Sequence, residues 1–200
     1  MAIEEFPNKE ADLPKDLLDV VNMNADRCEI FWVEKNTKAY KKIIPTMERF
    51  PDAVVISVDD DGNYPTHFVE TMLKYWCFNG KSCPIACMSK STKHHTGIGC
   101  LVKKEYFGRY LDDAYANLIL KVGVDKLPFD DMLYTKCILK NGLQYKHCNI
   151  SSNSIKSRHY RRSDFNLTNK KSDRQKRQFK HDAKRMGRMI EEYFRNSIVK

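Results

Sequence analysis

Val54-Val55-Ile56-Ser57-Val58-Asp59-Asp60-Asp61-Gly62 decides the fold, because an apolar strand that ends in carboxylates is typical of an α/β sheet with a ligand site at its edge. Turn-forming residues bound this strand at 51–52 and at 62–65. Strand residues alternate between faces, so we expect Asp59 and Asp61 to point one way and Asp60 the other. Two carboxylates on one side suit Mg²⁺ or Mn²⁺ and a substrate diphosphate. The alternative interpretation is an acidic surface turn.

The remainder of residues 1–150 alternates between strand and helix patterns. Strands are predicted at 28–33, 54–58, 84–88, 99–102 and 143–148, and helices at 37–50, 65–78, 104–120 and 130–140. Such alternation favours one α/β domain with a mixed, partly parallel sheet flanked by helices. A chain of 200 residues with 42% hydrophobic content buries one sizeable core and has no room for two full catalytic domains.

The composition also indicates the cellular compartment of the protein. No apolar run approaches the roughly 20 residues that a membrane helix needs, and the first residues lack the pattern of a signal peptide. The seven cysteines are odd in number and most have apolar neighbours, which fits reduced thiols in a cytoplasmic protein. Six potential zinc ligands lie near one another in sequence, but without a paired C-x-x-C they do not favour a structural zinc site: Cys77, Cys83, Cys87, His94, His95 and Cys100.

Charge is concentrated near the C-terminus. Residues 156–188 hold 13 Lys/Arg and three Asp, a net charge of +10, whereas the other 167 residues carry −1. We predict a polar linker at 151–171 and a basic amphipathic helix at 172–200. One apolar stripe follows the spacing of that helix: Phe179, Ala183, Met186, Ile190 and Tyr193. The helix is expected to dock on the body, to lie on an anionic membrane, or to contact nucleic acid, of which the last is disfavoured because interleaved aromatic residues are few.

An ordered set of motifs resembles bacterial family 2-like glycosyltransferases of the GT-A fold. The set comprises Phe6-Pro-Asn-Lys-Glu-Ala-Asp-Leu-Pro14, Trp32-Val-Glu34, Tyr40-Lys-Lys-Ile-Ile-Pro45, Val58-Asp-Asp-Asp61, Tyr64-Pro65, Gly97-Ile-Gly99 and Phe129-Asp-Asp131. The resemblance implies metal-dependent transfer of a sugar from a nucleotide-sugar donor to a glycan or a lipid-linked acceptor, in the synthesis of surface polysaccharide. It also implies a cytoplasmic enzyme, and the basic helix adds peripheral attachment to the inner face of the membrane.

Site residues follow from the matched motifs. Asp59 and Asp61 match the family's Asp-x-Asp motif, which implies Asp61 as a metal ligand, Asp59 near the metal or the donor ribose, and Asp60 within the donor site. Asp130 and Asp131 match the later acidic pair that supplies the catalytic base. Capping of a helix N-terminus is the alternative role for this pair.

The residues that would contact the sugar and the phosphate are predicted from weaker sequence signals. Gly97 and Gly99 match the glycines that line the family's sugar pocket, although a plain turn explains them equally well. Lys41, with Lys38 and Lys42 as alternatives, is placed to reach phosphate from the predicted helix at 37–50. Lysines on an amphipathic helix also serve as its solvated face.

One departure from the family concerns the beginning of the chain. Family members normally begin with a strand-helix-strand unit that holds the nucleotide base, and few residues here precede the motif at Phe6. We therefore expect the base-binding part to be missing, the chain to be inactive alone or complemented by a partner, and a sheet edge to be exposed.

Two other functions remain open. The apolar strand followed by Asp59-Asp60-Asp61-Gly62-Asn63 also resembles the nucleophile and acid motif of haloacid-dehalogenase-like phosphatases. That motif normally belongs to the first strand of the chain, which is not its place here. A non-catalytic protein that binds partners through its basic tail is the second alternative.

Overall fold

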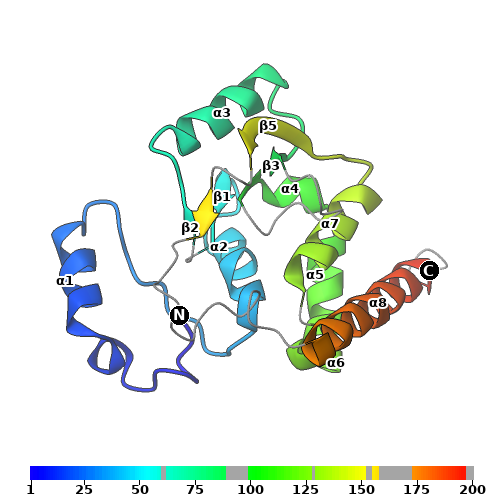
Figure 1. Ribbon diagram of the computed structural model, residues 1–200, viewed down its shortest axis with the longest axis horizontal. Coiled ribbons are helices and arrows are strands. Elements are labelled where there is room, and N and C mark those ends of the chain that lie inside the picture. Colours follow the sequence, from blue (N-terminus) through cyan, green and yellow to red (C-terminus); the bar gives the residue numbers. More distant parts are fainter. Residues whose placement is uncertain (60–61, 89–98, 128, 152–154, 158–172, 197–200) are drawn as a thin grey trace.

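The computed structural model describes residues 1–59, 62–88, 99–127, 129–151, 155–157 and 173–196. Its main sheet has the strand order β1-β4-β3-β5 (Figure 1). The strands are β1 (Val55–Ser57), β3 (Ile85–Met88), β4 (Cys100–Val102) and β5 (Lys146–Ser151). β4 pairs antiparallel with β1 and β3, and β3 pairs parallel with β5. The predicted mixed, partly parallel α/β sheet is confirmed.

Twelve helical segments occur in the described part of the chain. They are η1 (Lys9–Asp12), α1 (Lys15–Met23), η2 (Lys38–Lys42), α2 (Ile44–Arg49), α3 (Phe68–Phe78), α4 (Lys104–Phe107), α5 (Tyr110–Ala114), η3 (Tyr115–Ile119), α6 (Leu120–Val122), η4 (Val124–Lys126), α7 (Asp130–Lys140) and α8 (Asp173–Asn196). The predicted helix at 130–140 is confirmed at both ends. The predicted helix at 104–120 is interrupted at Gly108, whose φ of 54° ends α4. The predicted helix at 37–50 is divided into η2 and α2, and Pro45 lies in the first turn of α2, where its missing N–H costs nothing.

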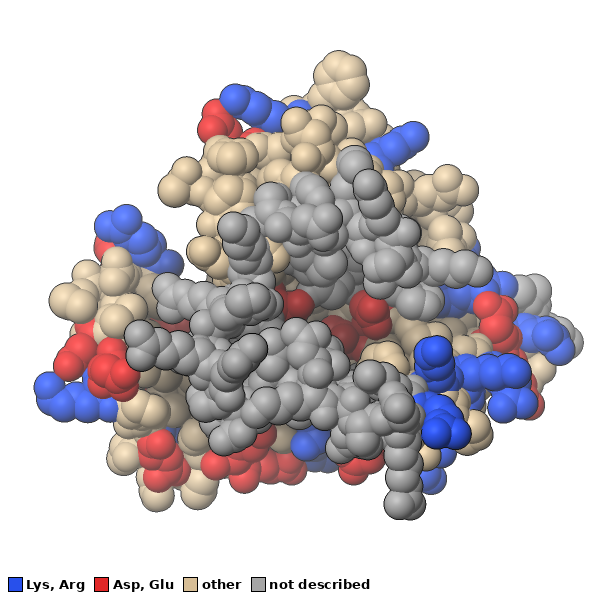
Figure 2. All heavy atoms as spheres, viewed as in Figure 1, with Lys and Arg blue, Asp and Glu red and all other residues tan. Residues whose placement is uncertain are grey.

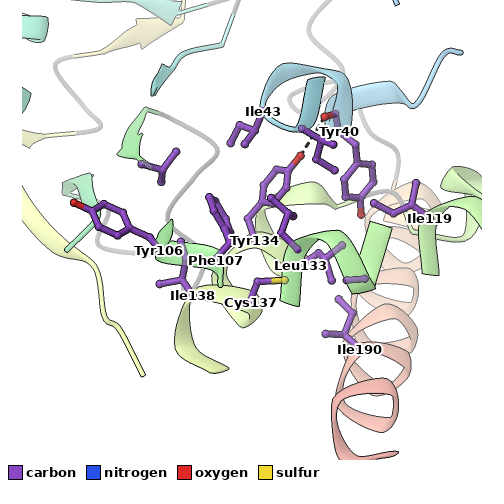
Figure 3. Close-up of a cluster of buried hydrophobic side chains, with 14 of the residues drawn as sticks. Tyr40, Ile43, Tyr106, Phe107, Ile119, Leu133, Tyr134, Cys137, Ile138 and Ile190 are labelled. Carbon is purple, nitrogen blue, oxygen red and sulfur yellow. Dashed lines mark hydrogen bonds between the residues drawn. The ribbon is translucent and has the colours of Figure 1, made fainter. Parts of the chain in front are cut away.

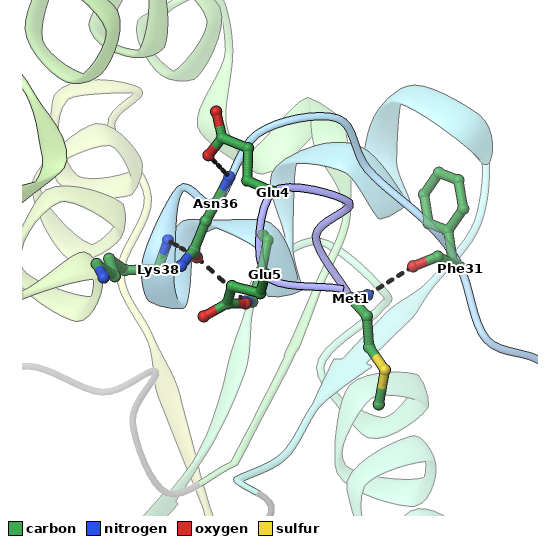
Figure 4. A network of polar contacts seen from close by, with 7 residues as sticks. Met1, Glu4, Glu5, Phe31, Asn36 and Lys38 are labelled. Carbon is green, nitrogen blue, oxygen red and sulfur yellow. Dashed lines mark hydrogen bonds and ion pairs between the residues drawn. The ribbon is translucent and has the colours of Figure 1, made fainter. Parts of the chain in front are cut away.

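The predicted strand at 28–33 is wrong. Its backbone pairs with the first residues of the chain and not with the main sheet: the Met1 amino group donates to the Phe31 carbonyl at 2.7 Å, and the Ile3 N–H donates to the Val33 carbonyl at 2.8 Å (Figure 4). A single parallel bridge joins Ala2 and Val33. The apolar pattern at 28–33 therefore marks a segment that pairs with residues 1–3 and is not a strand of the main sheet.

The sheet separates two apolar clusters, because alternate residues of β4 face opposite sides. Leu101 packs with Phe68 and Met72 of α3 on one side. Cys100 and Val102 face the larger cluster, which includes side chains of η2, α2, α4, α5, α7 and α8. Figure 3 shows part of this larger cluster, with Tyr40, Phe107 and Tyr134 at its centre and Ile190 of α8 at its border.

The basic helix α8 packs on this larger cluster. Met186 and Ile190 of the predicted apolar stripe are 0% and 3% exposed and face the body. Phe194, which the predicted stripe did not include, is 1% exposed and faces it as well. Phe179, near the start of the helix, remains 44% exposed while its ring makes an edge contact with Phe129. Lys136 of α7 forms an ion pair with Glu191 of α8. The helix is thus part of the folded body.

Most of the predicted linker at 151–171 lies outside the described residues. Lys156–Ser157 is described, and it forms strand β6, which pairs antiparallel with β2 (Gly62–Asn63) directly after the acidic stretch. All seven cysteines are free thiols, and five are buried, as the sequence predicted: Cys83, Cys87, Cys100, Cys137 and Cys148. Among the described helices none is both long and apolar enough to cross a membrane.

The packing of α8 predicts unequal effects of two methionine truncations. Met186→Ala should lower the free energy of unfolding by about 2–4 kcal/mol, because it opens a cavity under α8. Met23→Ala, at a side chain that is 75% exposed on α1, should change it by less than about 0.5 kcal/mol. Urea unfolding of both variants measures the difference. Equal stabilities would show that α8 does not pack on the body.

Candidate functional site

The loop that follows β1 is fixed by local contacts of Asp59 and Tyr64. The Asp59 N–H donates to the Tyr64 hydroxyl at 2.8 Å, and the Gly62 N–H donates to the Asp59 carbonyl at 3.3 Å. A Cβ at Gly62 would come within 2.4 Å of the Tyr64 ring, so this close approach requires glycine. Asp60 and Asp61 lie outside the described residues. These contacts hold the backbone at Asp59 and at Gly62, on either side of these two residues.

The Asp59 carboxylate forms an ion pair with Lys42, the last residue of η2. Their charged atoms lie 2.5 Å apart, and the side chains are 33% and 38% exposed. Lys41, which the sequence favoured, instead binds the Glu5 carboxylate at 2.7 Å and the Asn36 side chain at 3.2 Å. Figure 4 shows Glu5 and Asn36 close together in this neighbouring polar network. The structure therefore brings Lys42, rather than Lys41, to the Asp-x-Asp stretch.

Asp130 begins α7 and belongs to the same group of charges. Burial and, to a smaller extent, the charge of Asp131 raise the pKa of its carboxyl to about 6, against the opposing effect of the Lys42 ammonium. Since Lys42 acts on Asp59 and on Asp130, we call Lys42, Asp59, Asp130 and Asp131 the acidic centre. In Figure 2 acidic side chains lie recessed near the middle of the face shown.

Two buried side chains, those of Cys100 and Tyr40, are affected by the charges of the acidic centre but carry no charge themselves. Burial, followed by the charges of Asp130 and Asp59, raises the pKa of the Cys100 thiol to about 12. Burial and the two carboxylates of α7 also raise the pKa of Tyr40, whose hydroxyl donates to the Leu127 carbonyl at 2.9 Å. Both groups are buried and stay neutral near pH 7, and the low dielectric constant of such surroundings strengthens the interactions between nearby charges.

The two carboxylates of α7 differ in their surroundings. Asp131 accepts a hydrogen bond from the Met132 N–H at 2.9 Å, a contact that satisfies one of the free amides in the first turn of the helix. Asp130 carries the raised pKa, near the pH at which a general base is most effective. Phe129 is the N-cap of α7, so neither aspartate is the capping residue, and Asp131 satisfies an amide within the first turn. Asp130, with its raised pKa, is the better candidate for proton transfer.

Gly99 contributes close packing behind the Asp59 loop. Its φ is +152°, and a Cβ there would lie 2.9 Å from the Phe68 ring and 3.4 Å from the Cys87 sulfur. The Phe68 ring packs against Tyr64, the residue that holds the Asp59 N–H, with ring centroids 4.6 Å apart. Gly99 therefore supports the loop through Phe68 and Tyr64. Its place in a sugar pocket stays a prediction, and Gly97 lies outside the described residues.

A divalent cation fits the donor chemistry of the acidic centre. Asp59 and Asp130 supply hard carboxylate oxygens, and Mg²⁺ or Mn²⁺ commonly takes one or two of these together with water and substrate phosphate. Within the described ranges there is no cluster of three or more Asp, Glu, His or Cys side chains arranged around one point. Asp59 and Asp130 are thus the described carboxylates that would hold such a cation, with water or a phosphate as its further ligands.

The raised pKa of Asp130 predicts a pH-dependent effect of Asp130→Asn. An aspartate in the unfolded chain ionises near pH 4, whereas Asp130 in the folded protein stays protonated up to about pH 6. Ionisation therefore destabilises the folded wild type as pH rises between these values. The free energy of unfolding of Asp130→Asn, relative to that of the wild type, should therefore rise by up to about 3 kcal/mol between pH 4 and pH 7.

Urea unfolding at several pH values measures this gain. Asp113→Asn, at an exposed aspartate of α5, is the matched control and should show no comparable trend. If the difference in free energy of unfolding between Asp130→Asn and wild type does not change from pH 4 to pH 8, the pKa of Asp130 is not raised in the folded protein.

Comparison of the chain with protein-family models, with curated proteins and with solved structures found no match. Functional assignment therefore depends on the acidic centre itself and on the motifs that supply its residues.

Proposed function

We propose that the protein is a glycosyltransferase of the family 2-like, GT-A type, which transfers a sugar from a nucleotide-diphosphate donor to a glycan or lipid-linked acceptor. The observation that carries the proposal is the convergence of two distant acidic motifs. Asp59, after β1, forms an ion pair with Lys42, and the charge of the same lysine lowers the pKa of Asp130 at the start of α7. These are the two motifs from which the resemblance draws its donor site and its base.

The acidic centre suits the proton transfer that this reaction needs. The acceptor hydroxyl oxygen forms a bond to the anomeric carbon of the sugar, the bond from that carbon to the diphosphate breaks, and the hydroxyl proton goes to a base. Asp130, with a pKa of about 6, is mostly ionised at pH 7 and still holds a proton more strongly than an exposed aspartate. It is the candidate base, with Asp131 beside it.

The leaving nucleoside diphosphate needs positive charge. When bound, Mn²⁺ or Mg²⁺ would neutralise the charge that develops on the diphosphate. Asp59 would hold the metal together with Asp61, as the Asp-x-Asp motif implies. Cys100 and Tyr40 are buried and uncharged, and the low dielectric constant of such surroundings would strengthen each of these charge interactions.

Binding of metal and nucleotide tests this proposal. Mn²⁺ with uridine or guanosine diphosphate, at about ten times the dissociation constant, should stabilise the wild type by about 1.4 kcal/mol and raise Tm by roughly 3–5 °C. Asp59→Asn and Asp61→Ala should abolish this shift, whereas Asp113→Asn should retain it. Equal shifts in wild type and Asp59→Asn, measured by differential scanning fluorimetry, would rule out the assigned donor site.

We further propose that the exposed face of α8 brings the enzyme to anionic membranes, where lipid-linked acceptors reside. Because Met186 and Ile190 pack on the body, this role depends on charge and not on insertion of the apolar stripe. Lys180, Lys184 and Arg188 are exposed at successive turns of the helix.

Co-sedimentation with liposomes tests the membrane role. Wild type should bind vesicles that contain phosphatidylserine and should dissociate as salt increases. Combined replacement of Lys180, Lys184 and Arg188 by Gln should weaken binding by at least tenfold, because each basic residue contributes about 1 kcal/mol. Replacement of three exposed basic residues outside α8, namely Lys15, Arg27 and Lys121, is the charge-matched control. Equal loss in both triple variants would show that net charge, and not α8, determines binding.

A further inference from the structure

The acidic centre already contains a cation of its own. The Lys42 ammonium lies 2.5 Å from an Asp59 oxygen, and its charge also lowers the pKa of the Asp130 carboxyl and of the buried Cys100 thiol. A single lysine thus balances carboxylates from the end of β1 and from the start of α7. This is the electrostatic position that a divalent cation bound to Asp59 would take.

The backbone that carries Lys42 is firmly held, so a change in this ion pair is confined to the side chain. Tyr40 and Ile43, on either side of Lys41 and Lys42, are each 1% exposed. The Thr46 hydroxyl donates to the Lys42 carbonyl at 2.9 Å. The Lys42 side chain, in contrast, is 38% exposed, and partly exposed ion pairs are weak enough to exchange for another ligand.

We propose that Lys42 is a resident counter-ion that occupies Asp59 in the absence of metal, competes with a divalent cation for this carboxylate, and turns to the diphosphate once the cation has bound. The inference rests on the proposed function, because it assigns a role within the same site. Two positive charges cannot share one carboxylate oxygen without repulsion, so metal binding displaces the ammonium. A diphosphate brought by the metal then offers Lys42 a new anionic partner.

Lys42→Gln should change the affinities for two ligands in opposite directions. Binding of Mn²⁺ alone, followed by electron paramagnetic resonance of the free ion, should become about fivefold to tenfold tighter, because the competing ammonium is gone. Binding of inorganic pyrophosphate in saturating Mn²⁺, followed by calorimetry, should become weaker by a similar factor, because one charge partner of the anion is lost. A residue that merely stabilises the fold would not produce this reversal.

Two further variants control for charge and for folding. Lys42→Arg keeps the positive charge and should bind Mn²⁺ about as weakly as wild type. Lys103→Gln removes a different ion-paired lysine, which binds Glu105 beyond the far end of β4, and should leave both affinities unchanged. Unfolding of all variants followed by circular dichroism establishes that each is folded.

The outcomes separate this inference from the proposed function. If Lys42→Gln binds Mn²⁺ no more tightly than the wild type does, Lys42 does not compete with the cation for Asp59. The same conclusion follows if neither protein binds Mn²⁺. Pyrophosphate affinity that is unchanged in Lys42→Gln overturns the transfer of Lys42 to the diphosphate. If no variant binds a nucleoside diphosphate while Lys42→Gln still binds Mn²⁺ more tightly, the proposed function fails and the counter-ion role stands.

Discussion

The arrangement of the acidic centre depends on the buried contact between Tyr40 and Tyr134. The two rings meet edge to face with centroids 5.8 Å apart, and the Tyr134 hydroxyl donates to the Tyr40 carbonyl at 3.2 Å. Tyr40 belongs to η2, which carries Lys42, and Tyr134 belongs to α7, which begins with Asp130. Because this hydrogen bond is buried, breaking it would leave an unsatisfied polar group in the core and would cost free energy. The contact thereby holds a lysine and a carboxylate from distant parts of the chain within electrostatic range.

The charges of the centre gain their strength from the same core. Cys100 lies in register with Ser57 at the end of β1, and the charges of Asp130 and Asp59 raise the pKa of its thiol. Burial keeps the Cys100 thiol protonated and raises the pKa of Asp130 toward neutrality. An aspartate with such a pKa is destabilising to the fold, and this cost is typical of residues that serve in binding or catalysis. The proposed roles of Asp130 and Lys42 follow from this position between core and solvent.

The C-terminal helix combines a structural role with an exposed basic surface. Met186, Ile190 and Phe194 extend the larger apolar cluster, while lysines and arginines on the other faces remain in solvent. Long basic side chains on the solvent face of a packed helix keep their charge available for anionic partners. The helix therefore stabilises the domain through one face, and the proposed membrane contact would use the other.

The sequence by itself determined the elements whose signals are local. The apolar run at 54–58 predicted β1, the spacing of Phe68 and Met72 predicted the buried face of α3, and the acidic pair at 130–131 marked the start of α7. These signals are local because turn residues, helical periodicity and the preference of acidic residues for helix N-termini act within a few residues. The sequence also identifies Asp59 and Asp130 as candidate site residues, from the motifs that contain them.

Only the tertiary structure decided which partners these elements have. The segment at 28–33 pairs with residues 1–3, because extended chain offers the same hydrogen-bonding groups to any neighbour. Lys41 and Lys42 are adjacent and alike in sequence, and the burial of Tyr40 directs one toward Glu5 and the other toward Asp59. Periodicity revealed the apolar stripe of α8 but not the surface that covers it. Burial, and with it the raised pKa of Asp130, arises from contacts between distant residues, which no local pattern encodes.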